Sequence, residues 1–381
     1  CLPHAVVIGA QKSGSTALFS YLTLHPSIST PRRKELHYFD RLHVATRRRS
    51  FSSYVKQFEK YDASMISMEA TPSYMLSVPG LRQLATVLPQ ARLLVILRDP
   101  VERFYSEYQM KHRRVLHQLN VSNPDTATAI RHVLAGCANS TIDVAKVPGF
   151  VKSVRKQRSR TRFSKCMQAK RAHRAGYITC FRHPVIRCVP VFYVLDARTP
   201  YPYLYYSLET LRPLAEVVES EVAQAEACMA DGRPAVKLHD GVEVAAPLLQ
   251  WGVPQCWMNG SDSNIVKDFV VRGVYYPQVV QLLQLFPREQ VLILRNTDLL
   301  SQPTPTMDAV WDFLGLSPFH TPAMDASGIQ KRVDELYPSF DELTGWSVAG
   351  HYPPLPDGLR SKLEKFYEAH TRQLEALLAA I

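Results

Sequence analysis

The chain has 381 residues, of which 46% are hydrophobic and 21% charged, with a formal net charge of +11 and an isoelectric point of about 9.3. This length and apolar content allow a large buried core, either as one domain or as a domain with an insertion. The positive charge favours anionic partners, so nucleic acid, acidic polysaccharide and anionic membrane surfaces stay open. Apolar runs such as 93–97 are far shorter than the roughly 20 residues that span a bilayer, so we expect no membrane anchor or signal peptide in this sequence.

The chain begins with Cys1 rather than Met, and its first predicted strand follows almost at once. We therefore expect that upstream sequence, with any targeting segment, has been removed. Six of the seven cysteines lie between residues 137 and 256, in the same region as three N-x-S/T sequons, Asn120, Asn139 and Asn259. Together they favour a secretory-pathway lumen with disulfides and glycans over chance sequons and reduced thiols. No C-x-x-C pair occurs, which argues against a zinc site.

A short polar loop near the start of the chain carries the first functional signal. The apolar residues 5–8 and a glycine precede it, and apolar residues at helical spacing follow, which predicts strand, tight loop and helix. Backbone N–H groups, hydroxyls and one ammonium at the positive end of a helix are typical of a phosphate or sulfate site. The residues concerned are Lys12, Ser13, Gly14, Ser15 and Thr16. The alternative interpretation is a Gly/Ser-rich turn without a ligand.

A nucleoside triphosphatase would show the pattern G-x-x-x-x-G-K-[ST] at this loop. Gly9 and Gly14 have the required separation, but Ser15 occupies the position of the lysine. The sequence therefore disfavours a nucleotide kinase or triphosphatase.

The next candidate segment, 31–40, contains a carboxylate and an imidazole two residues apart. In an extended conformation Glu35 and His37 point to one face, and Leu36 and Tyr38 to the other. This predicts a proton acceptor and a second titratable group on one wall. The alternative is a surface strand with a solvated glutamate.

A second anion site is predicted where the apolar strand 91–97 ends. Arg98 follows the strand, Pro100 then opens a helix, and Ser106 lies on that helix. Ligands of open α/β sheets collect at the carboxyl ends of the strands. An arginine and a hydroxyl at this place can hold a second phosphate.

These segments together resemble a known family. R-D-P-x-x-R-x-x-S, here Arg98 to Ser106, resembles the 3′-phosphate-binding segment of sulfotransferases that use 3′-phosphoadenosine 5′-phosphosulfate (PAPS), and K-S-G-S-T resembles their 5′-phosphosulfate loop. With K-E-L-H-Y-F-D, the start of the chain is similar to heparan sulfate 3-O-sulfotransferases and N-deacetylase/N-sulfotransferases. Residues 272–276, 290–295 and 307–316 are more similar to N-acetylgalactosamine 4-sulfate 6-O-sulfotransferase. The resemblance covers about residues 3–112 and 268–381.

The resemblance implies roles for single residues. Glu35 corresponds to the catalytic base and His37 to its neighbour, while Gly273 lies where the family has a glycine near the nucleotide. The heparan sulfate families carry a lysine after the glutamate of the next strand, but here Ala70 follows Glu69, so that task is absent or moved to another cation.

A polar loop after the last predicted core element contains two further cations. Lys331 and Arg332 are candidates for closing over the phosphates, with a solvated charge pair as the alternative.

The middle of the chain, 113–267, is longer than the family leads us to expect. Between residues 152 and 174 it holds ten lysines and arginines and no acid. This run is either a solvated charge block or a track for an anionic acceptor. Nucleic-acid binding would favour interleaved aromatic residues, and only Phe163 occurs there.

From the residues and the resemblance we expect an α/β protein with a three-layer, P-loop-kinase-like fold, a mostly parallel central sheet and a basic, cysteine-containing insertion. The whole of 1–381 is then a single sulfotransferase domain with an acceptor-binding region at 113–267. The expected activity is metal-independent transfer of sulfonate from PAPS to a carbohydrate hydroxyl, with PAP as product and an anionic polysaccharide or glycosaminoglycan as acceptor. Neither nucleic acid nor, apart from a removed anchor, a membrane is an expected partner, and the expected compartment is the Golgi lumen.

Three other functions are alternatives to this expectation. The sequons and the basic run disfavour a small-molecule sulfotransferase for phenols or steroids, and Ser15 disfavours a nucleotide kinase. The joint presence of Lys12, Glu35 and Arg98 disfavours a polyanion-binding protein without catalysis.

Overall fold

The computed structural model describes residues 2–31, 34–41, 50–58, 65–118, 212–229, 235–245, 269–336 and 353–381. The chain divides into two compact units. The first comprises Cys1–Glu107, Val218–Pro338 and Pro353–Ile381, and the second Tyr108–Val217 and Ser339–Tyr352. The sheet and the candidate site lie in the first unit. The predicted insertion at 113–267 stays a prediction, because most of it lies outside the described residues, together with the three sequons and the basic run.

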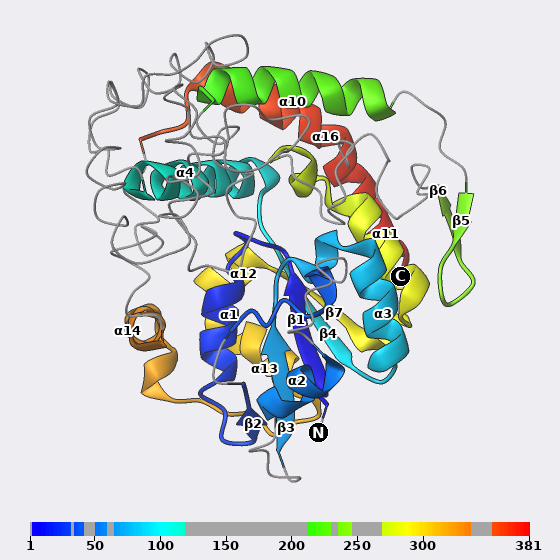
Figure 1. Cartoon of the computed structure of the whole chain (residues 1–381), viewed down its shortest axis with the longest axis vertical. Helices are drawn as coiled ribbons and strands as arrows, with labels where there is room; N and C mark the ends of the chain where they lie inside the picture. Colours follow the sequence, from blue (N-terminus) through cyan, green and yellow to red (C-terminus); the bar gives the residue numbers. More distant parts are fainter. Residues whose placement is uncertain are drawn as a thin grey trace, which may run out of the picture. The chain divides into compact units, whose positions relative to one another are not determined.

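A five-stranded sheet forms the centre of the first unit, with the strand order β2-β3-β1-β4-β7 (Figure 1). All four neighbouring pairs are parallel, which confirms the predicted parallel α/β sheet. The strands are β1 Ala5–Gly9, β2 Ile28–Ser29, β3 Ile66–Ala70, β4 Arg92–Leu97 and β7 Val291–Arg295. A separate antiparallel pair consists of β5 Ala235–Lys237 and β6 Glu243–Ala245.

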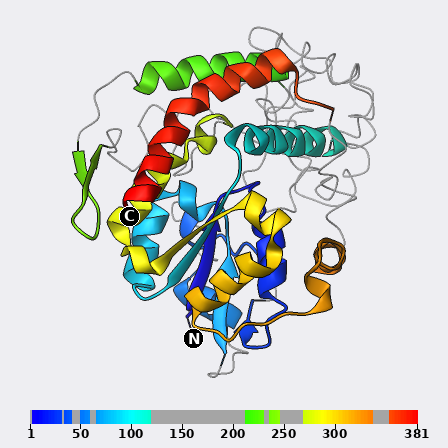
Figure 2. The same ribbon diagram turned by 180° about the vertical axis from the view of Figure 1, so that it is seen from behind.

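Helices cover both faces of this sheet (Figures 1 and 2). The α-helices are α1 Ser15–Leu22, α2 Phe51–Val55, α3 Val78–Val87, α4 Pro100–Gln118, α10 Leu214–Met229, α11 Tyr275–Leu285, α12 Asn296–Ser301, α13 Pro303–Leu314, α14 Ala326–Leu336 and α16 Asp357–Ala380. The 3₁₀ helices are η1 Phe39–Arg41, η2 Lys56–Phe58, η3 Tyr74–Leu76, η7 Val271–Gly273, η8 Arg288–Gln290 and η9 Pro322–Met324. In the described part of the chain, no helix combines the length and apolar character that crossing a membrane requires.

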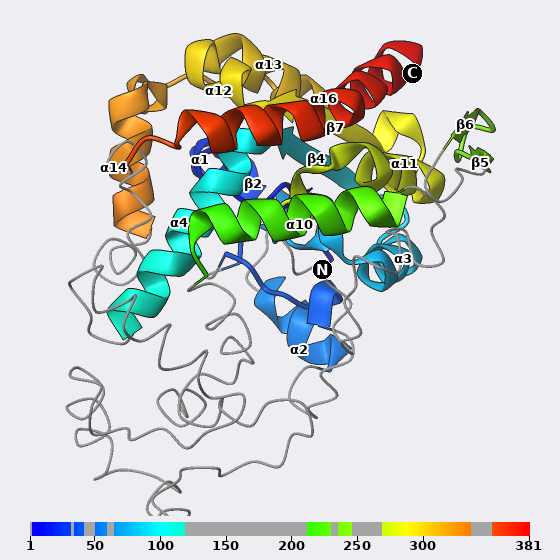
Figure 3. The ribbon, with the colours of Figure 1, turned by 90° about the horizontal axis from the view of Figure 1, so that it is seen from above.

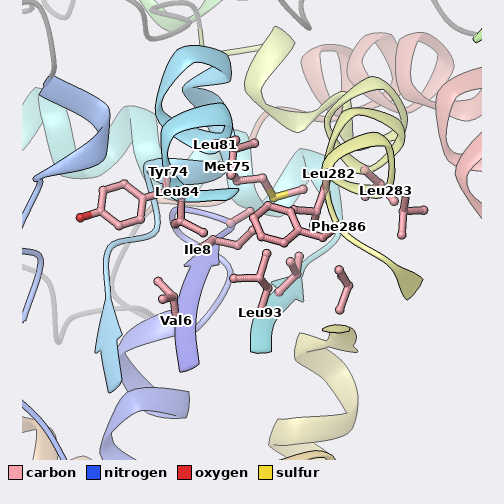
Figure 4. Close-up of a cluster of buried hydrophobic side chains, with 14 of the residues drawn as sticks. Val6, Ile8, Tyr74, Met75, Leu81, Leu84, Leu93, Leu282, Leu283 and Phe286 are labelled. Carbon is pink, nitrogen blue, oxygen red and sulfur yellow. The ribbon is translucent and has the colours of Figure 1, made fainter. Parts of the chain in front are cut away.

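Alternating residues of the central strands build two apolar layers. Val6 and Ile8 of β1 and Leu93 of β4 pack with Leu81 and Phe286 from the side of α3 and α11 (Figure 4). Figure 3 shows these two helices together on one side of the sheet. The residues between them along β1 and β4 point to the other face, because side chains alternate along a strand.

The second layer contains Val7 and Leu94 with Leu18 of α1 and Trp311 of α13. Since β1 and β4 are buried on both faces, they consist of apolar runs rather than alternating polar and apolar residues. The three-layer arrangement follows from this pattern.

The segment before α2 departs from the extended conformation that its alternation predicts. Residues 34–38 form no strand, and the backbone is left-handed at Glu35, with φ 63°, and at His37, with φ 53°. Long-range hydrogen bonds hold this conformation: Glu35 N–H donates to Ala70 O at 2.9 Å, and Tyr38 N–H to the Tyr74 hydroxyl at 3.0 Å. The extended conformation in which Glu35 and His37 would share one face is therefore not adopted.

Candidate functional site

The loop between β1 and α1 is shaped by two left-handed residues, Lys12 with φ 68° and Gly14 with φ 98°. A Cβ at Gly14 would lie 2.5 Å from Asn296 Nδ2, so any side chain there would also require the Asn296 side chain to shift. Among the described residues no side chain caps the first turn of α1, which starts at Ser15. Its N–H groups therefore face the loop as donors for an anion.

The loop lies at the edge of the sheet where the parallel strands end. Ala10 N–H donates to Ile96 O of β4 at 2.9 Å, and Asn296, which approaches Gly14, directly follows β7. The Ser13 side chain is buried, with its Oγ 3.4 Å from the hydroxyl of Tyr275. The predicted phosphate loop is thus hydrogen-bonded to β4 and in contact with α11.

The predicted second anion site consists of Arg98 at the end of β4 and Ser106 on α4. Arg98 is 28% exposed at its side chain and lies 3.5 Å from Glu102 Oε2, whereas Ser106 is buried. Asp99 accepts the Glu102 N–H at 2.9 Å and so caps the start of α4.

The carboxylate of Glu35 contacts an ammonium group and an imidazole. Its Oε1 lies 2.8 Å from Lys34 Nζ, and its Oε2 lies 3.4 Å from His37 Nε2. Burial on its own would raise the pKa of Glu35, but Lys34 and His37 outweigh it and hold that pKa well below its ordinary value. Glu35 is therefore ionised in the free protein.

A buried carboxylate fixes the imidazole of His37. Its Nδ1 lies 2.7 Å from Asp40 Oδ2, and the Ser73 hydroxyl donates to the same oxygen at 2.5 Å. Asp40, which lies in η1, is not among the predicted site residues. Its spacing of three residues from His37 is the sequence signal that could have identified it.

Lys12 lies in the electric field of both predicted subsites. Burial lowers the pKa of Lys12 to about 8; Glu107 and Glu35 oppose this shift, while Arg98 and Lys34 add to it. The loop lysine thus interacts electrostatically with the candidate base and with the arginine of the second anion site.

A buried ion network connects the loop to α4. The two oxygens of Glu107 separately accept from Arg103, at 2.6 Å, and from Arg272. Arg272 also donates to Gln11 Oε1 at 2.7 Å, and Arg103 donates to Phe269 O. The sequence analysis assigned none of these residues a role, although the i,i+4 spacing of Arg103 and Glu107 is a recognisable signal.

Three predicted site residues have surroundings that differ from the expectation. A Cβ on Gly273 would lie 2.8 Å from the hydroxyl of Tyr367, so close packing against α16 explains this glycine, and its contact with a nucleotide stays a prediction. Lys331 and Arg332 lie on the helix α14, which packs against α1, and the prediction of a loop was wrong. Lys331 is exposed and Arg332 half-buried.

No group of three or more His, Cys, Asp or Glu side chains in the described ranges is arranged to hold a metal ion.

Comparison with known proteins finds similarity to sulfotransferases. Residues 2–162 match the family model of the sulfotransferase domain. The chain is 24% identical over 320 residues to the membrane-associated sulfotransferase kil1 of Dictyostelium discoideum. This alignment covers 83% of the present chain and 57% of kil1. It is 33% identical over 106 residues to heparan sulfate glucosamine 3-O-sulfotransferase 6 of Homo sapiens, with coverage of 28% and 30%.

A similar match joins the chain to the bifunctional heparan sulfate N-deacetylase/N-sulfotransferase 1 of Caenorhabditis briggsae, with 33% identity over 118 residues, 28% of this chain and 13% of that one. The chain thus spans little more than half the length of the first of these relatives and a third or less of the other two. A crystal structure of a sulfotransferase from Alicyclobacillus acidocaldarius superposes with a TM-score of 0.46 at 18% identity, covering 100% of this chain and 96% of that one. Residues 2–162 therefore match a sulfotransferase domain, and the chain as a whole is similar to sulfotransferases.

Proposed function

We propose that this protein transfers the sulfonate group of PAPS to a hydroxyl of a carbohydrate, with an anionic polysaccharide or glycosaminoglycan as the acceptor class. The observation that carries the proposal is the ionised Glu35, held between Lys34 and His37 and interacting electrostatically with the loop lysine Lys12. A base and a cation so arranged suit a reaction in which one oxygen loses a proton while another gains negative charge.

The residues of the loop fit the 5′ end of PAPS. The left-handed backbone at Gly14 turns the chain into α1, and the first turn of α1 offers its N–H groups to an anion. Ser13, Ser15 and Thr16 add hydroxyls, as in the predicted site. PAPS supplies the sulfonate group when bound and leaves as PAP.

The second phosphate of PAPS distinguishes it from ATP, and we assign its recognition to Arg98 and Ser106. Arg98 has the exposure and the planar donors that a phosphate requires, and its partner Glu102 is also bound by Arg360 at 2.7 Å. A bound phosphate can therefore take over Arg98 while Glu102 keeps a cationic partner.

Glu35 takes the proton of the acceptor hydroxyl as the hydroxyl oxygen attacks the sulfur of the sulfonate group. His37, fixed by Asp40, orients the carboxylate, and the ammonium of Lys12 stabilises the charge that builds where the donor bond breaks. Catalysis by these residues consists of positioning and electrostatics, as in phosphoryl transfer.

The acceptor class rests on the positive charge of the chain and on the names of the heparan sulfate relatives. We infer the Golgi lumen as the compartment from the sequons and the cysteines of the sequence. The basic run at 152–174 is our candidate for the acceptor track.

Transfer of radiolabelled sulfonate from PAPS to desulfated polysaccharides and to small phenols tests the proposal. Lys12→Ala should abolish the transfer, while Lys365→Ala, which removes an exposed lysine of α16, should retain it. Label that enters only the phenols would identify a small-molecule sulfotransferase instead. A protein that binds neither PAPS nor PAP would refute the proposal.

A further inference from the structure

The segment that carries Glu35 and His37 is anchored through its backbone N–H groups. Glu35 N–H donates to Ala70 O at 2.9 Å, and His37 N–H donates to Thr71 Oγ1 at 3.5 Å. Tyr38 N–H donates to the Tyr74 hydroxyl at 3.0 Å. Left-handed backbone at residues other than glycine persists only where surrounding contacts enforce it. These hydrogen bonds are therefore what keeps the two catalytic side chains in place.

Two of these anchors are side-chain hydroxyls that share one buried carboxylate, Glu69, at the end of β3. Thr71 Oγ1 donates to Glu69 Oε2 at 2.9 Å, and the Tyr74 hydroxyl lies 3.2 and 3.3 Å from its two oxygens. The Tyr54 hydroxyl also donates to Glu69, at 2.6 Å. Glu69 has 0% exposed surface, so it acts on the reaction only through its neighbours.

When Glu69 is ionised, which its raised pKa of about 7 confines to neutral and alkaline pH, its carboxylate sets the direction of each hydroxyl. A hydroxyl has one proton, and when it donates that proton to Glu69 its lone pairs are left for another donor. In Thr71 and Tyr74 those lone pairs accept the N–H groups of His37 and Tyr38. If Glu69 were protonated and donated to one of these hydroxyls, that hydroxyl would have to point its proton elsewhere and could no longer donate it to Glu69.

We propose that Glu69 is a positioning residue for sulfonate transfer, which orients the hydroxyls of Thr71 and Tyr74 and through them holds the segment that carries Glu35 and His37. This inference rests on the proposed function of the site. It assigns a task to a buried glutamate that neither the donor loop nor the base requires directly.

Glu69→Gln tests the inference with little change of shape. The amide has one oxygen and one NH₂ group, so at least one hydroxyl meets a donor instead of an acceptor. We expect kcat to fall about 10- to 100-fold, the effect of losing a charge-assisted hydrogen bond. The dissociation constant of PAP, measured by calorimetry, should change by less than about twofold, because the donor loop is anchored elsewhere.

The two tyrosines provide a matched pair of variants. Tyr54→Phe and Tyr74→Phe each remove a buried hydroxyl that donates to Glu69, but only Tyr74 also accepts a backbone N–H of the catalytic segment. Tyr74→Phe should lower kcat as Glu69→Gln does, and Tyr54→Phe should stay within about twofold of wild type. Thr71→Ser, which keeps the hydroxyl, should retain the rate that Thr71→Val loses.

Hydrogen exchange of the peptide 34–41 gives a readout that does not depend on activity. It should speed up in Glu69→Gln and Tyr74→Phe and stay unchanged in Tyr54→Phe. If the wild-type protein transfers no sulfonate, the proposed function fails, and the exchange rates still show whether Glu69 holds the segment. Equal effects of the two tyrosine variants on kcat and on exchange, or unchanged exchange in Glu69→Gln, would overturn the inference.

Discussion

Replacing Glu107 by glutamine should destabilise the protein strongly. The side chains of Glu107, Arg103 and Arg272 have exposed fractions of only 0%, 1% and 5%, and each carboxylate oxygen accepts from a different guanidinium group. Each hydrogen bond to a charged group contributes about 1.5 to 3 kcal/mol, and the amide can replace only one of the two. Both arginines stay charged, so their burial is no longer compensated. We expect a loss of about 3 to 5 kcal/mol in the free energy of unfolding.

The control for this variant lies on the same helix. Glu102 is 38% exposed and pairs with Arg98 and Arg360 at the surface, so Glu102→Gln should cost less than about 1 kcal/mol. Denaturant unfolding followed by circular dichroism, with the slope compared between variants, measures both losses. Equal losses in the two variants would refute the reasoning from the buried network.

Glu107→Gln also has an expected effect on the reaction. Glu107 is the strongest of the charges that raise the pKa of Lys12 against burial. Its removal should lower that pKa below about 8 and move the alkaline decline of kcat/KM towards neutral pH.

Three further predictions concern single residues. Glu35→Gln should lower kcat by about 10² to 10⁴ with PAP binding retained in calorimetry, because only the proton acceptor is lost; a full rate would move the role of base to His37. The value of kcat/KM for PAPS should decline above a pH of about 8, because the ammonium of Lys12 loses its proton there. The Lys12→Arg variant should have a lower kcat/KM than wild type but show no such decline up to a pH of about 10. The same pH profile in the variant and in wild type would contradict this role of Lys12. Burial raises the pKa of Glu69 from 4.5 to about 7, so between these values the native state binds more protons than the unfolded state and its stability falls as the pH rises. Between these pH values the free energy of unfolding of wild type, measured in urea, should fall by up to about 3 kcal/mol relative to that of Glu69→Gln. If the free energies of unfolding of the two proteins changed in parallel with pH, the pKa of Glu69 would not be raised.

The sheet could be predicted from the sequence because its signals are local. The strands β1 and β4 are buried on both faces and therefore appear as apolar runs, and each is followed by a loop and a helix in the expected order. The end of α13 could be predicted as well, because a glycine such as Gly315 commonly follows the last residue of a helix. In the structure Gly315 adopts the left-handed conformation that ends the helix, with φ 71°.

The geometry around the base could not be predicted, because residues distant in the sequence impose it. Glu35 and His37 do lie together as expected, but in left-handed turns rather than on one face of a strand. Their partners Ala70, Thr71 and Tyr74 are more than 30 residues away in the chain. Periodicity within a segment contains no information about such partners.

Lys34 bears on the question that Ala70 raised in the sequence. The position after Glu69 lacks the lysine of the heparan sulfate enzymes, but Lys34 places a buried ammonium 2.8 Å from the base, and its charge acts on Lys12 as well. Lys34 is therefore a candidate for the cation that the sequence lacks after Glu69.

The same contact limits how strong a base Glu35 can be. A carboxylate whose pKa is held well below its ordinary value by Lys34 and His37 is a poor proton acceptor in the free protein. It accepts a proton readily only when the acceptor hydroxyl has lost much of its electron density to the new bond, or when Lys34 turns to another anion. A donor bound with its sulfonate or phosphate beside Lys34 would be such an anion and would raise the basicity of Glu35.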